Sequence, residues 1–182
     1  QRARRHVCRP LAVSDHEIAG LRPLGTADGF LLRVATWLNV NWAGQRFTFA
    51  QVDADPHLAK YHRFVPERGD FGFVATLAGE PTGVVWVSSF PVETPGYGFV
   101  RAGVPELSLC VLPGYRGVGL GGALLRAATA EGRRRGLSHG QIAALTSWNP
   151  AQRFGLYSKG TVAPGYDADF CLVDDSSSWT VR

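Results

Sequence analysis

Residues 112–122 read LPGYRGVGLGG, a run in which five of the eleven positions are glycine. The run follows PELSLCVLP at 105–113, whose alternating side chains are typical of a mostly buried strand. It leads into ALLRAATAEGRRR, whose apolar spacing predicts a helix over about 119–135. The first N–H groups of a helix lack internal partners, and the helix dipole adds positive potential there. The stretch therefore predicts either an anion site between strand and helix or a plain tight turn.

The chemistry of this loop favours a phosphate as the anion. Gly117, Gly119, Gly121 and Gly122 leave no side chain between the backbone and a ligand, and Arg116 can add a direct charge. The spacing matches neither G-x-x-x-x-G-K-[ST] nor G-x-G-x-x-G, so nucleotide-binding loops of those two kinds are disfavoured.

The rest of the chain predicts a single domain in which strands and helices are mixed. The first part is expected to form a strand within 17–23, a helix at about 27–39 capped by Thr26 and a short helix at 55–63 capped by Asp55. Two hairpin strands within 70–90 follow, and then the strand at 105–113 and the helix at 119–135. The last part is expected to form a strand at 141–147, a short helix at 149–157 and a last strand near the C-terminus.

Composition narrows the possible functions. The 182 residues are 45% hydrophobic, which suits a packed core, and no apolar run approaches the ~20 residues that span a bilayer. Four of the 19 basic side chains lie in the first ten residues, where there is no acid, so the remainder carries 15 of each sign. The net charge of +4 thus belongs to a leader, and nucleic-acid binding is disfavoured. Three widely spaced cysteines indicate reduced thiols in a cytoplasmic protein.

VLPGYRGVGLGGALL resembles the acetyl-CoA signature of the GNAT acetyltransferase superfamily, [RQ]-x-x-G-x-[GA], with Arg116, Gly119 and Gly121 at the fixed positions. The order of the elements before it is also similar, and the resemblance covers about residues 15–138. It implies an α/β (α+β) fold with a mixed, mostly antiparallel sheet flanked by helices. We therefore expect a basic leader at 1–14 and one GNAT-like domain at 15–182.

The resemblance also implies a binding site for acetyl-CoA, without a metal. The pyrophosphate would lie on the N–H groups of Arg116, Gly117, Val118, Gly119, Leu120, Gly121 and Gly122. The pantetheine arm would insert between the fourth strand and a fifth strand, where it would bond to the backbone of Cys110, Val111 and Leu112. Asn149 matches the asparagine with which the family contacts CoA.

Acetyl transfer to an amine needs a base for the ammonium proton and an acid for the departing thiolate. Glu106 opens the fourth strand and is the expected base, with Glu93 and Asp70 as weaker candidates. Tyr157 is the expected acid, although it comes two residues later than the family pattern places its tyrosine. Aromatic residues are candidates for the acceptor pocket, with core packing as the alternative: Trp37, Trp42, Phe47, Phe49, Trp86 and Tyr97.

The tail, residues 141–182, resembles a different group of proteins. SWNPAQRFGLYSKGTVAPGYDADFCLVDD is similar to the C-terminal end of cyclic amidohydrolases, the allantoinase, dihydroorotase and hydantoinase group. The chain has no H-x-H and no room for a ~250-residue barrel, which argues against a metal-dependent hydrolase. Two accounts remain: a junction of unrelated pieces near 136–141, or a tail co-opted to complete the sheet.

The sequence therefore predicts an N-acetyltransferase that moves the acetyl group of acetyl-CoA to a small-molecule or peptide amine, directly and in a ternary complex. The alternative is an inactive CoA-binding or structural domain whose C-terminal part derives from an amidohydrolase. Neither a nucleic acid nor a membrane is an expected partner, and the resemblance allows a homodimer.

Overall fold

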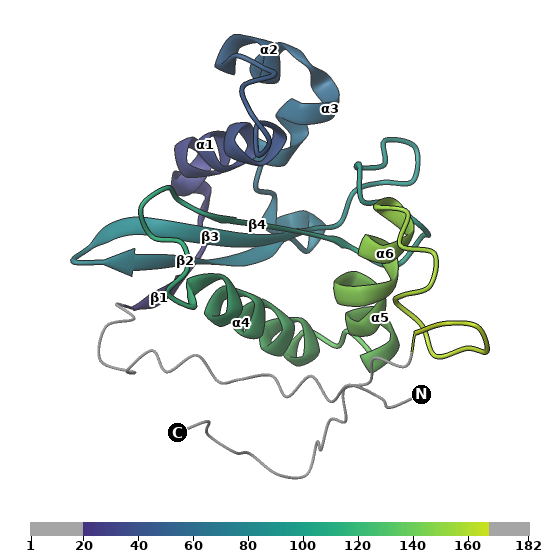
Figure 1. Ribbon diagram of the computed structural model, residues 1–182. Helices are drawn as coiled ribbons and strands as arrows, with labels where there is room; N and C mark the ends of the chain where they lie inside the picture. Colours follow the sequence, from purple (N-terminus) through teal and green to yellow (C-terminus); the bar gives the residue numbers. More distant parts are fainter. Residues whose placement is uncertain (1–19, 168–182) are drawn as a thin grey trace.

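The computed structural model describes residues 20–167, and at its centre lies a four-stranded antiparallel sheet (Figure 1). The strands lie side by side in chain order: β1 (Leu21–Pro23), β2 (Phe71–Leu77), β3 (Glu80–Ser88) and β4 (Glu106–Val111). Strands β2 and β3 are joined by a two-residue turn, Ala78 and Gly79, whose φ angles are 50° and 88°. Turns with two positive φ angles match the twist of paired strands. The predicted hairpin is confirmed.

Helices cover both faces of the sheet, with α1 (Gly29–Val40) on one face and α4 (Leu120–Arg134) on the other (Figure 1). Successive side chains of a strand point to opposite faces. Val84 of β3 accordingly packs in a buried cluster with Leu32 of α1, and its neighbour Val85 packs in a second cluster with Leu124 of α4. The predicted fold, a mostly antiparallel sheet flanked by helices, is confirmed.

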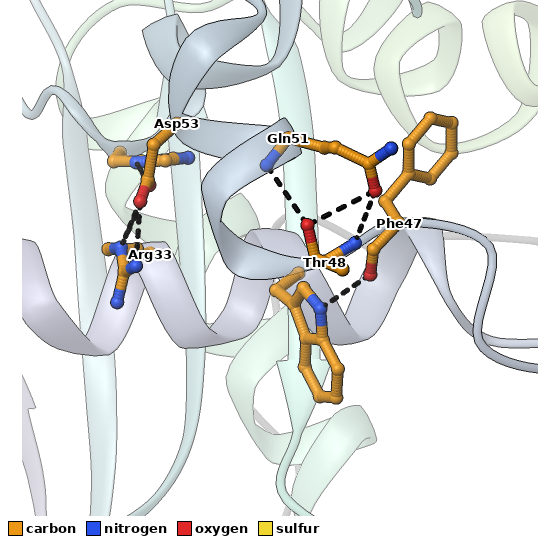
Figure 2. A network of polar contacts seen from close by, with 7 residues as sticks. Arg33, Phe47, Thr48, Gln51 and Asp53 are labelled. Carbon is orange, nitrogen blue, oxygen red and sulfur yellow. Dashed lines mark hydrogen bonds and ion pairs between the residues drawn. The ribbon is translucent and has the colours of Figure 1, made fainter.

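Short helices join α1 to β2. They are α2 (Phe49–Ala54), α3 (Pro56–Ala59), η2 (Lys60–His62) and η3 (Pro66–Arg68). Figure 2 shows how α2 is held: Thr48 Oγ1 accepts from the Gln51 N–H at 3.2 Å, and Arg33 of α1 makes a 2.6 Å ion pair with Asp53. The α3 cap is as predicted, because Asp55 accepts from the His57 N–H at 2.8 Å. Helix α2 was not predicted, although Thr48 and Gln51 form a capping box that marks a helix start.

The predicted cap of the first helix is wrong. Thr26 lies inside a single turn, η1 (Thr26–Asp28), that precedes α1. Asp28 instead accepts from the Gly25 N–H at 2.9 Å and pairs with Arg22 at 2.6 Å. The Asp28 side chain, rather than that of Thr26, therefore accepts from a backbone N–H group at the start of this helical region.

The expected strand at 141–147 is also wrong, because this segment is helical. Three short helices follow one another here: α5 (His139–Ala143), the π-helix η4 (Ala144–Trp148) and α6 (Asn149–Arg153). Ser138 and Gln141 form a reciprocal capping box, with bonds of 3.2 and 2.9 Å, that starts the run. Within residues 20–167, the sheet therefore ends at β4. The short helix predicted at 149–157 is confirmed over its first five residues, as α6.

The predicted leader at 1–14, the first residues of the strand expected within 17–23 and the last strand near the C-terminus lie outside the described residues. Across 20–167, no helix combines the length and apolar character that crossing a bilayer requires.

Candidate active site

The glycine loop connects the end of β4 to the start of α4. Gly114, Gly117 and Gly119 all have φ between 82° and 89°, and Gly119 is the residue directly before the helix. Residues with side chains rarely adopt these angles, so the path of the loop depends on glycine. Arg116 lies exposed within the loop, and its Nε donates to the Val111 carbonyl at 3.0 Å. The arginine is thus held against the end of β4.

The backbone N–H groups of this loop are available to a ligand. Among the described residues, the N–H groups of Gly119, Leu120, Gly121 and Gly122 donate no backbone hydrogen bond, and Ala123 resumes the pattern by donating to Gly119 at 3.1 Å. Leu120 is buried against the sheet with Leu124, so the packing of α4 holds these groups in place. Four free N–H groups at a helix start, beside one guanidinium, fit a phosphate-bearing ligand.

The outer edge of β4 is the second part of the predicted donor site. The Leu112 N–H donates to Thr82 on β3 at 3.0 Å, and the Leu112 carbonyl accepts from the Tyr115 N–H at 3.1 Å. In an antiparallel pair, alternate residues bond to the partner strand. Val111 therefore has its backbone at the free edge, where its carbonyl accepts from Arg116. The N–H of Leu112 is already paired with β3 and does not fit the predicted role.

Cys110 is a buried thiol of the core. Burial raises the pKa of this thiol, so it stays protonated at neutral pH. A thiol is a far weaker nucleophile than a thiolate. Cys110 is therefore poorly suited to carry an acyl group itself.

A pocket of about 370 Å³ lies at the other end of β4. Its walls come from helices α1, α3, η2, η4 and α6, from strands β3 and β4, and from the connection before β4. Of the predicted site residues, Glu106 and Asn149 line this pocket, as do two of the candidate aromatics, Trp86 and Tyr97. The structure therefore brings together residues up to 63 positions apart that were singled out separately.

Glu106 is buried in the wall of this pocket, with 8% of its surface exposed. Its Oε2 accepts from the Tyr61 hydroxyl at 2.8 Å and from the Gly98 N–H at 2.9 Å, whereas its Oε1 has no partner among the described residues. The connection before β4 lies directly against this carboxylate, since a Cβ on Gly96 would come within 2.1 Å of Oε1. One carboxylate oxygen is thus held by two hydrogen bonds, and the other is buried without a hydrogen-bond partner among the described residues.

Tyr61 links this carboxylate to the overlying chain. Its hydroxyl donates to Glu106 and accepts from the Tyr97 N–H at 2.6 Å. Burial, reinforced by the negative charge of Glu106, raises the pKa of Tyr61 far above its usual value, so the hydroxyl keeps its proton. Sequence reasoning missed Tyr61, although Leu58 and Tyr61 are spaced to share the buried face of a helix.

The other predicted residues lie elsewhere. Tyr157 follows α6, is 85% exposed and does not line the pocket, so the structure does not bring it to Glu106. Asp70 is fully buried and accepts four hydrogen bonds, and Glu93 is exposed. Trp37 and Phe49 stack at 4.6 Å between α1 and α2, away from the pocket.

The described residues hold no cluster of three or more histidine, cysteine or acidic side chains that could bind a metal ion. The candidate site is therefore built from one free carboxylate oxygen, a pocket and a glycine loop, all arranged along β4.

A strand–glycine loop–helix unit on an antiparallel sheet is a geometry suited to an anionic, phosphate-bearing ligand. The family follows from comparison with known proteins: the model of the acetyltransferase (GNAT) family matches residues 34–155. The chain therefore belongs to the GNAT acetyltransferase family.

Two solved structures illustrate what this chain is similar to. The chain is similar to a GCN5-related N-acetyltransferase from Ralstonia eutropha JMP134, with 22% identity, 85% of this chain and 97% of that one covered, and a TM-score of 0.48. It is also similar to a ribosomal-protein-alanine N-acetyltransferase from Brucella melitensis biovar Abortus 2308, with 16% identity, coverage of 90% and 98%, and a TM-score of 0.41.

A short part of the chain is similar to allantoinases, as the tail predicts. The protein from Deinococcus radiodurans is 54% identical over 48 residues, which are 26% of this chain and 11% of that protein. The protein from Escherichia coli is 41% identical over 49 residues, which are 27% and 11%. The chain thus spans about a tenth of the length of these relatives.

Proposed function

We propose that this acetyltransferase uses acetyl-CoA as its donor and transfers the acetyl group directly to an amine of a small molecule or peptide in a ternary complex, in the cytoplasm. One observation carries the proposal: β4 has a buried carboxylate with a free oxygen at its first residue and a loop of unpaired N–H groups after its last. Five residue steps of strand span ~17 Å. An extended thioester arm can bridge that span, with its pyrophosphate on the loop.

The proposed reaction assigns a task to each end of the strand. The free Oε1 of Glu106 takes one proton from the ammonium of the acceptor, and the neutral nitrogen attacks the thioester carbonyl. The C–N bond forms, the C–S bond breaks, and the second nitrogen proton goes to the departing thiolate, directly or through water. Tyr157 would serve as the predicted acid only if a rearrangement brought it into the pocket, because it is exposed outside it here.

One observation favours the alternative, a domain that binds CoA without transferring the acetyl group. The segment expected to form the fifth strand is helical, and it packs on β4 through Leu107, where Ala144 and Leu145 close a small cluster with Val104. Within residues 20–167, no strand lies beside the edge near Val111 to form the other side of the slot for the pantetheine arm.

The two functions are separated by two measurements on the same protein. Both predict that acetyl-CoA raises the melting temperature, because a ligand that binds only the folded state stabilises it. Only the transferase releases CoA thiol from acetyl-CoA when an amine panel is added, with the acetylated amine detected by mass spectrometry. Absence of a thermal shift at millimolar acetyl-CoA would refute both functions, and a shift without thiol release would leave only the alternative.

Arg116→Ala is expected to weaken acetyl-CoA binding by ~1–3 kcal/mol, because a charged hydrogen bond to the pyrophosphate is lost. Isothermal titration calorimetry measures the change. Arg134→Ala, at the far end of the same helix, removes an equal charge and should leave the dissociation constant unchanged. Equal affinities of the Arg116 variant and the parent protein for acetyl-CoA would contradict the proposal that the pyrophosphate binds at this loop.

A further inference from the structure

Unpartnered polar atoms concentrate in the pocket beside Glu106. Five buried side-chain atoms in the described chain lack a hydrogen-bond partner, and four of them belong to residues that line this pocket. Those four are Thr36 Oγ1, Trp86 Nε1, Glu106 Oε1 and Asn149 Oδ1. Each of these residues is more than nine-tenths buried. Because buried polar groups are normally paired, a ligand in this pocket could supply partners that these four atoms lack.

The chemistry of these atoms identifies one end of that ligand. Glu106 Oε1 and Asn149 Oδ1 are both hydrogen-bond acceptors, and the first carries negative charge. A protonated amine offers up to three N–H donors and the opposite charge. An ammonium group therefore matches these two acceptors better than a hydroxyl or a carboxylate does.

The lining residues and the volume of the pocket indicate what the rest of the ligand is like. The rings of Tyr61, Trp86 and Tyr97 line the pocket together with aliphatic side chains such as Leu58 and Leu145. A volume of about 370 Å³ lies at the small end of the ~300–1,000 Å³ typical of small-molecule sites. The pocket therefore fits a compact molecule with an apolar, preferably aromatic, body.

The position of Arg153 indicates a further chemical group of the ligand. This arginine ends α6, lines the same pocket and places its guanidinium 5.8 Å from the centre of the Tyr97 ring. Its side chain is exposed and forms no ion pair with any described residue, in contrast to Arg68, whose guanidinium binds Asp70. A guanidinium is suited to bind a carboxylate through two parallel hydrogen bonds. An unpaired one at the edge of an apolar pocket marks a place for an anionic group.

We propose that the acceptor is a small zwitterionic amine with an apolar or aromatic body, whose ammonium binds Glu106 and Asn149 and whose carboxylate binds Arg153. This inference rests on the proposed function, since it names the substrate class of the same site. It selects free amino-carboxylate compounds over simple amines and over amines within a long peptide.

The test compares matched probes that differ only in the carboxylate. One pair is 4-(aminomethyl)benzoate and benzylamine, and the other is phenylalanine and phenethylamine, which together cover a distant and an adjacent carboxylate. Calorimetry without acetyl-CoA measures binding, and thiol release with acetyl-CoA measures turnover. In at least one pair the carboxylated member is expected to bind about tenfold more tightly, the gain of one charge-assisted contact.

Variants of Arg153 connect the preference to this residue. Arg153→Gln should reduce the binding ratio of the favoured pair to near one, and Arg153→Lys should retain part of it because the charge remains. Arg134→Gln, on α4 and outside the pocket, is the matched control and should leave the ratio unchanged.

Each result decides between the two proposals. Equal binding within both pairs, binding of neither member, or a preference that survives Arg153→Gln overturns the assigned substrate class. Thiol release that is equally fast with the amines lacking a carboxylate leaves the transferase function in place and removes only this inference. A carboxylate preference in binding that depends on Arg153, without any thiol release, supports the ligand class and overturns the transferase function.

Discussion

A Glu106→Gln variant is expected to lose about 10²- to 10⁴-fold of its kcat/KM for acetyl transfer, the usual contribution of a general base. Glutamine keeps the shape of the side chain, and its amide oxygen can still accept from Tyr61 and Gly98. The amide nitrogen would replace the free Oε1, and it cannot take a proton from an ammonium group. Thiol release under subsaturating amine measures the loss.

Three expected results distinguish a role of Glu106 as base from a purely structural role. The thermal shift with acetyl-CoA should be unchanged, because the glycine loop is at the other end of β4. The deficit should shrink as the pH approaches the pKa of the amine, since solvent then removes the proton. Glu93→Gln, an exposed acid in the connection before β4, should retain full activity. A Glu106 variant that is as active as the parent at neutral pH would rule out the proposed base.

The parts of the fold that could be predicted from the sequence are those with local signals. The unit of β4, glycine loop and α4 combines strand alternation, a cluster of glycines and helical spacing within about thirty residues, and it forms where it was predicted. The segment at 141–147 carried competing signals. Its apolar residues suit a strand, as does the resemblance to a family in which a fifth strand follows the fourth, whereas Ser138 and Gln141 mark a helix start. The segment is helical in the structure, starting at the capping box of Ser138 and Gln141.

The pocket was harder to predict because no local signal describes it. Glu106 could be singled out by its place on the fourth strand, but its partner Tyr61 lies 45 residues earlier in a short helix. Gly96 and Gly98 contact the carboxylate from a connection with no regular structure. Which oxygen is bound and which is free follows only from the packing of these separate segments.

Asp70→Ala is expected to lower the free energy of unfolding by about 3–5 kcal/mol, the effect of breaking a buried ion pair on one side. The Asp70 carboxylate is fully buried, and it accepts from Arg68 through two nitrogens, at 3.0 and 2.5 Å. It also accepts from the Val65 and Ser89 N–H groups at 3.0 and 3.1 Å. Removal leaves a guanidinium and two amides without partners, which costs more than the lost bonds themselves.

The matched control is Asp53→Ala, which removes the partner of Arg33 in a similar two-nitrogen ion pair near the surface (Figure 2). Because exposed pairs contribute little to stability, urea denaturation should detect a much smaller change. Equal losses in the two variants would contradict the role assigned to burial.

The position of Asp70 also connects this loss of stability to the pocket. Its bond to the Ser89 N–H fixes the start of the connection before β4, and its partner Arg68 lies 4.9 Å from the centre of the Phe90 ring. Phe90 in turn contacts the edge of Tyr61, with ring centres 5.1 Å apart. The Asp70 variant, assayed at a temperature where it is still folded, should therefore retain acetyl-CoA binding but have a raised KM for the amine, because the covering of Glu106 is loosened while the glycine loop is not.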